Sequence, residues 1–110
     1  MKLIIAVIQD EDSNKLVKKL RQKDYMLTKL ASTGGFLSAG NTTLLIGVDK
    51  ENVDDVISII KSQCKTREKA TTAAIPNAYT SSSGFVSRTI NVKIGGATVF
   101  IVDVDDFIKI

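Results

Sequence analysis

The stretch TKLASTGGFLSAGNTTLLIGV, residues 28–48, decides how this chain is organised. Its two ends are rich in apolar and β-branched residues, as strands are, and they flank a glycine-rich centre that carries Phe36. A hairpin needs only about two to five turn residues, whereas this centre spans residues 33–41. Glycines leave backbone N–H groups uncovered, so that an anion or a purine edge can approach them closely. We therefore predict that the functional site lies at this loop.

The length and composition predict one small domain, residues 1–110, with long loops at about 33–41 and 65–88. A hydrophobic content of 44% and a charged content of 25% are ordinary globular values and argue against disorder. No stretch reaches the ~18 apolar residues that a membrane span needs, and a signal peptide is not expected. The single cysteine, Cys64, cannot form an internal disulfide, which favours the cytoplasm.

The spacing of apolar residues predicts the helices and strands in the first half of the chain. Residues 3–8 are a continuous apolar run, expected to be a central strand. Residues 10–13 supply N-caps and acidic groups for a helix that runs to about Lys23, with Leu16, Val17 and Leu20 facing inward. Residues 25–32 and 42–48 are expected to be strands that pair as an antiparallel hairpin around the loop.

The second half of the chain predicts one more helix and one more strand. The helix begins at residues 49–52 and carries an apolar stripe formed by Val53, Val56, Ile57, Ile60 and Cys64. Residues 65–83 have the composition of a long loop. Residues 89–102 are expected to be the last strand, and the pair Gly95-Gly96 inside it indicates a bulge, a bend, or the close approach of a ligand or another chain. The tail, residues 103–110, is amphipathic and is expected to pack on a neighbour.

The order β-α-β-β-α-β predicts an α+β fold of the ferredoxin-like kind. Right-handed crossovers would place both helices on one face of a four-stranded antiparallel sheet. Because the first and last strands are apolar on both faces, the other face must also be covered, and a second subunit is the expected cover.

The residue inventory argues against an enzyme. The chain has no histidine, which removes the usual general base and the commonest metal ligand, and one cysteine cannot build a zinc site. It contains no phosphate-binding glycine motif of the Walker or dinucleotide type. The acidic residues 10–12 are interpreted as helix-terminal groups, and those at 103, 105 and 106 as a solvated turn. We expect no catalytic residue, no metal and no cofactor.

Three blocks of the sequence together resemble a known family. These are residues 2–13, residues 28–48 and the segment GGATVF at residues 95–100. In this order they resemble the PII-like cyclic di-AMP receptors of Gram-positive bacteria (the PstA type). The resemblance implies a PII-like homotrimer that binds cyclic di-AMP in clefts between subunits, reorders its two loops, and thereby changes its contacts with a downstream protein, with neither nucleic acid nor membrane as a partner.

The same resemblance implies a set of ligand-binding residues, each at a position that matches the family pattern. A purine would lie against Phe36, and backbone groups beside it would read its edge. The Asn41 amide would read a base edge, the Thr28 hydroxyl would donate to a phosphate or base, and Gly47 would leave room for the ligand. The full set is Thr28, Gly35, Phe36, Leu37, Asn41 and Gly47, with Gly95, Gly96 and Ala97 approaching from the neighbouring subunit.

Two departures from the family pattern keep alternatives open. The family commonly has an arginine where this chain has Met26, and a basic residue where it has Ser38. A trimeric interaction or scaffold protein with weakened or changed nucleotide specificity is therefore the alternative prediction. A single-stranded RNA binder would need aromatic residues on the first and third strands, and residues 3–8 and 42–48 contain none.

Overall fold

The computed structural model describes residues 1–30, 40–76 and 85–110, and for residues 71–76 and 85–88 the backbone alone. Its elements, in chain order, are β1 Lys2–Gln9, α1 Asp10–Gln22, β2 Leu27–Leu30, β3 Asn41–Val48, the 3-10 turn η1 Lys50–Asn52, α2 Val53–Gln63, β4 Arg67–Pro76, β5 Phe85–Ile94 and β6 Ala97–Asp103. Residues 31–39 and 77–84 lie outside the described parts.

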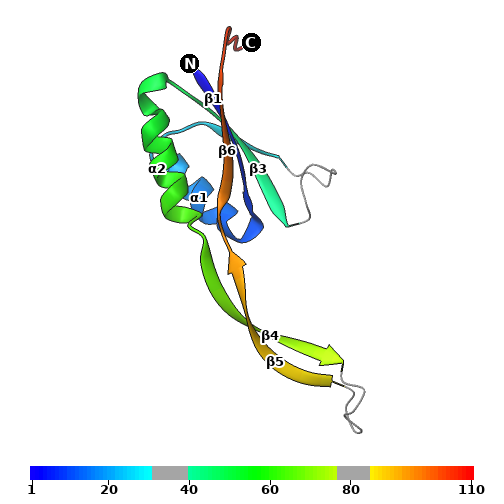
Figure 1. The fold of residues 1–110 in the computed structure, drawn as a ribbon. Helices are drawn as coiled ribbons and strands as arrows, with labels where there is room; N and C mark the ends of the chain where they lie inside the picture. The colour runs from blue at the N-terminus through cyan, green and yellow to red at the C-terminus, as the bar shows by residue number, and fades with distance from the viewer. Residues whose placement is uncertain (31–39, 77–84) are drawn as a thin grey trace.

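Four strands form one antiparallel sheet in the order β2-β3-β1-β6, and both helices lie on one face of it (Figure 1). The central strand β1 is the apolar run that the sequence predicts, with β3 and β6 on its two sides. The predicted α+β fold, a four-stranded antiparallel sheet with two helices, is confirmed.

The core lies between the sheet and the helices. Alternate residues of β1 point toward the helices, and the side chains of Ile4, Ala6 and Ile8 are at most 1% exposed. Each fully buried aliphatic side chain contributes about 1.5–3 kcal/mol relative to an exposed one. The predicted helical stripes supply the other side of this core. Its remaining buried members are Leu16, Leu20, Leu44, Ile46, Val48, Val56, Ile60 and Cys64.

Within the described parts of the chain no helix lies on the opposite face of the sheet, which we call the open face (Figure 1). The strand register places Ile5 between Leu45 and Phe100 on this face. Phe100 and Val102 remain 44% and 45% exposed. Large apolar side chains therefore lie uncovered on the open face of a single chain.

The predicted loop at 65–88 is instead built around a hairpin. Strands β4 and β5 pair from Arg67 with Ile94 to Pro76 with Phe85 and form a separate two-stranded sheet. This hairpin extends away from the rest of the molecule, and the two chain ends lie together at the opposite end (Figure 1). The sequence favours a loop at residues 65–83 because that segment is rich in threonine and serine and carries the only proline, and alternation is visible only at residues 89–94.

The predicted single strand at 89–102 is also two strands. Gly95 and Gly96 have φ of +83° and +86°, a conformation that side chains rarely adopt, and they separate β5 in the hairpin from β6 in the main sheet. Of the alternatives for this glycine pair, the structure therefore confirms a bend.

The start of α1 corrects a third prediction. The acidic residues Asp10, Glu11 and Asp12 lie in its first turn, as the helix dipole favours. The N-cap, however, is Gln9, and it makes no side-chain capping hydrogen bond. Asp12 is instead buried and forms an ion pair with Arg67, so it links α1 to a segment that is distant in the sequence.

Candidate ligand-binding groove

A groove of about 820 Å³ lies where β2 begins and β3 ends, at the end of the molecule that carries both termini. Ligand sites commonly enclose about 300–1,000 Å³, so this volume suits a small molecule. The groove is lined by Met1, Leu3, Lys23, Asp24, Tyr25, Met26, Leu27, Thr28, Leu45, Gly47, Val48, Asp49, Asn52, Val104, Phe107 and Lys109. We refer to it as the terminal groove.

The strand register explains the floor of the terminal groove. Thr28 on β2 pairs with Leu45 on β3, and Gly47 on β3 pairs with Leu3 on β1. All four lie on the open face. A Cβ built on Gly47 would meet no heavy atom within 4 Å, so the glycine leaves open space there. Two of the predicted ligand-binding residues, Thr28 and Gly47, are thus brought together.

The rim of the terminal groove has an apolar part and a charged part. Met26 is 73% exposed and Phe107 is 68% exposed, so both present apolar surface to an incoming group. The charged lining residues are two lysines, Lys23 and Lys109, with two aspartates, Asp24 and Asp49. This combination suits a ligand that has aromatic or apolar surface together with polar groups.

A polar cluster fixes the start of β2 against α2. The Tyr25 hydroxyl donates to the Asp55 carboxylate, and Lys23 Nζ lies 3.1 Å from Asp55 Oδ1. The hydrogen bond from Tyr25 and the ammonium of Lys23 lower the pKa of Asp55. The same hydrogen bond raises the pKa of Tyr25. The groove wall at Tyr25 is therefore held to the helical layer.

Of the other predicted ligand-binding residues, none that the structure describes lines the terminal groove. Asn41 begins β3, six positions before Gly47, and at about 3.4 Å per residue the two Cα atoms are about 20 Å apart. Gly35, Phe36 and Leu37 lie outside the described residues.

The glycine pair is at the Asn41 end of the sheet. Gly95 N donates to Gln9 Oε1 at 2.7 Å, and Gln9 pairs with Asn41 in the register of β1 and β3. Ala97 lines a second groove, of about 540 Å³, between α2 and β6. In one chain the described candidates therefore form two groups, with Thr28 and Gly47 at one end and Asn41, Gly95, Gly96 and Ala97 at the other.

Sequence reasoning missed part of this site. Phe107 and Lys109 line the terminal groove from the tail, and the only signal for them was the amphipathic pattern of residues 103–110. That pattern was interpreted as packing on a neighbour. Arg67 carried no signal at all, because its partner Asp12 is 55 positions away in the sequence.

Two kinds of feature are absent from the described residues. No helix in these parts of the chain is long and apolar enough to cross a bilayer. No three His, Cys, Asp or Glu side chains in the same parts are grouped so that they would hold a metal ion.

Comparison with known proteins adds two findings. The model of a family described as "Cyclic-di-AMP receptor" matches residues 1–110. A crystal structure of a protein from Pediococcus pentosaceus ATCC 25745, described as functionally unknown, is similar with a TM-score of 0.76. The two sequences are 39% identical, and the match covers 99% of this chain and 96% of that one.

Proposed function

This chain belongs to the cyclic-di-AMP receptor family, and from that membership we propose that it is a cytosolic signal-transduction receptor for cyclic di-AMP. The nucleotide binds at the interfaces of a homotrimer. Binding changes the conformation of the loops, and the change alters binding of a downstream protein. The observation that carries the proposal is the family match, because it spans residues 1–110 and not only the three blocks that resemble the family.

The terminal groove supports a nucleotide as the ligand. It combines the Thr28 hydroxyl, the open space above Gly47 and the exposed side chains of Met26 and Phe107. A hydroxyl can donate to a phosphate or a base, and an aromatic ring offers a face to a purine. Lys23, which is paired with Asp55, and Lys109 also line the groove and place positive charge where phosphates would bind.

The open face supports assembly into a homo-oligomer. Phe100 and Val102 on β6 and Leu30 on β2 are each at least 40% exposed, and exposed apolar side chains on one sheet face favour an interaction surface. Assembly would also bring together the two groups of candidate residues, which lie at opposite ends of the sheet in one chain. If Gly95 and Ala97 of one subunit approach Thr28 of the next, the two groups of candidate residues meet in one cleft.

Met26 supports the second candidate function, a trimeric interaction protein with weakened or changed nucleotide specificity. Its side chain is 73% exposed at the terminal groove, where the family commonly has arginine. Losing a charge-assisted hydrogen bond costs about 1.5–3 kcal/mol, which lowers affinity roughly ten- to hundredfold.

Isothermal titration calorimetry separates the two functions. A receptor is expected to bind one cyclic di-AMP per chain and to respond more weakly to cyclic di-GMP. Asn41→Ala should then lower the affinity strongly. Asn14→Ala, the same substitution at an exposed position of α1, should leave it unchanged. An absence of heat at high protein concentration would exclude the receptor function and leave the interaction protein.

A further inference from the structure

We propose that residues 9–12, where β1 passes into α1, couple the start of β3 to the position of the β4–β5 hairpin. Asn41 is at the start of β3, so the coupling would transmit ligand binding there to the hairpin. The ligand-dependent part rests on the proposed function, whereas the mechanical part concerns the folded chain alone. We call residues 9–12 the junction, and the two chain segments 64–67 and 94–96 the hairpin root.

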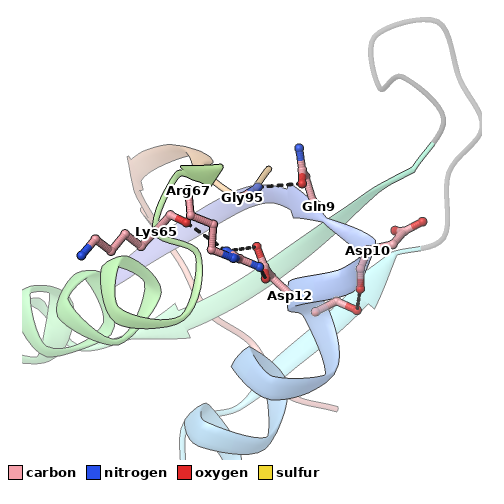
Figure 2. A network of polar contacts seen from close by, with 7 residues as sticks. Gln9, Asp10, Asp12, Lys65, Arg67 and Gly95 are labelled. Carbon is pink, nitrogen blue, oxygen red and sulfur yellow. Dashed lines mark hydrogen bonds and ion pairs between the residues drawn. The ribbon is translucent and has the colours of Figure 1, made fainter. Parts of the chain in front are cut away.

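The first attachment of the hairpin root is an ion pair to a buried carboxylate. Arg67, the first residue of β4, places Nη2 2.7 Å from Asp12 Oδ1 (Figure 2). The Asp12 side chain is only 3% exposed, and a buried carboxylate is stable only when it is paired. Arg67 Nη1 also donates to the Lys65 carbonyl oxygen at 2.9 Å. The guanidinium therefore holds β4 to α1.

The second attachment holds the other strand of the hairpin. Gly95 N, directly after β5, donates to Gln9 Oε1 at 2.7 Å (Figure 2). Gly96 N donates to the Cys64 carbonyl oxygen. A Cβ on Gly95 would lie 2.6 Å from Arg67 Nη1 and closer still to the Lys65 carbonyl oxygen. The glycine is therefore required for β5 to leave the root beside Arg67.

The same junction also holds the start of β3. Asp10 N donates to the Gly40 carbonyl oxygen at 2.8 Å, and the Thr42 hydroxyl donates to Asp10 Oδ1. Gln9 is the cross-strand partner of Asn41. Gln9 and Asp10 thus hold the start of β3, while Gln9 and Asp12 hold the hairpin root.

The hairpin is suited to respond to a small displacement at its root. In the described residues β4 and β5 pair mainly with each other, and an isolated two-stranded ribbon is only marginally stable. The molecule measures 66 × 26 × 19 Å, and the hairpin accounts for much of the long dimension (Figure 1). The direction of the hairpin is therefore set at the root, and a shift of the junction moves its far end further than the junction itself.

The test measures the hairpin position with and without the nucleotide. Spin labels are placed by Thr89→Cys on β5 and Ser58→Cys on α2, both exposed, in labelled chains diluted with unlabelled ones. Native Cys64 is buried, so it is not expected to react with the label. Pulsed electron-spin spectroscopy then gives the distribution of the label-to-label distance, and calorimetry of the same samples measures cyclic di-AMP binding.

Three variants carry the test. Arg67→Gln removes the cation, and Asp12→Asn with Arg67→Gln removes both charges, so that no buried carboxylate is left unpaired if the single variant unfolds. Lys2→Gln is the matched control, because it removes a lysine paired with Asp103 at the far end of β1. We expect a narrow distance distribution that shifts with cyclic di-AMP in the wild type and the control. In both root variants we expect a broader distribution and loss of the shift, with nucleotide binding retained.

Two results would overturn the inference. One is a root variant that binds cyclic di-AMP and keeps the wild-type distribution and shift. The other is a wild type that binds the nucleotide with no change in distance. If the wild type binds no cyclic di-AMP, the proposed function and the coupling fail together. The ligand-free distributions of the wild type and the root variants then decide the mechanical part alone.

Discussion

Gly47 lies directly opposite Leu3 on the open face of the sheet, and the space above Gly47 is empty. Its φ is not in the left-handed region, so the backbone does not demand glycine there. The described neighbours do not demand it either, since a Cβ would have no heavy atom within 4 Å. What glycine preserves at this position is access to the terminal groove.

Gly47→Ala is accordingly expected to leave the fold intact and to weaken nucleotide binding. Alanine is favoured over glycine inside a strand by roughly 0.5–1 kcal/mol, so the free energy of unfolding should not fall. Cyclic di-AMP affinity should fall by about tenfold or more, which corresponds to about 1.4 kcal/mol. Thermal unfolding and calorimetry measure the two effects. Unchanged affinity, with Gly47→Leu also unchanged, would place the ligand elsewhere.

Met26→Arg is expected to increase the affinity. A guanidinium at this exposed position of the groove would reach a phosphate, and a charged hydrogen bond of about 1.5–3 kcal/mol raises affinity roughly ten- to hundredfold. The gain should shrink as salt is added. Met26→Gln, which is polar but uncharged, is the control. An equal gain in both variants would mean that charge is not the cause.

Phe100→Glu is expected to prevent assembly of the proposed homotrimer. A carboxylate at this position would be desolvated when a second copy covers the open face, whereas the core on the other face of the sheet is unaffected. Light scattering should report the mass of one chain in place of three. Ser58→Glu changes the charge equally on the exposed side of α2 and should keep the mass of three chains. A trimeric Phe100→Glu would exclude the open face as the interface.

The Cys64 thiol is expected to resist modification and to make stability depend on alkaline pH. Burial raises its pKa to about 11, and the negative charge of Asp12 adds to the effect. The unfolded thiol titrates near 9.0 and the folded one later, so the unfolded state loses its proton first. The free energy of unfolding should therefore fall as pH rises from 9 toward 11. The fall should be smaller in Cys64→Ala, and equal falls in the two proteins would contradict it.

Local patterns in the sequence were enough for the elements of the core. The continuous apolar run around Ile5 predicts a central strand, and the spacing of Val56 and Ile60 predicts a helix that buries one side. These features are local because a side chain's face follows from the period of its own strand or helix. The family resemblance predicts which ligand binds and which residues contact it. Two of those residues, Thr28 and Gly47, lie together in the terminal groove on the open face.

The tertiary structure alone decided how the remaining parts meet. Residues 89–94 alternate apolar and polar side chains as a strand does, but the sequence does not show that this strand pairs with β4. The position of the hairpin depends on Arg67 reaching a carboxylate at Asp12. The acid at position 12 looks the same in the sequence whether it serves a helix dipole or a buried ion pair. Only its burial distinguishes the two, and burial depends on which distant segments pack against it. Sequence periodicity therefore determined the sheet and the helices, while long-range contacts determined the hairpin root and separated the candidate residues into two groups.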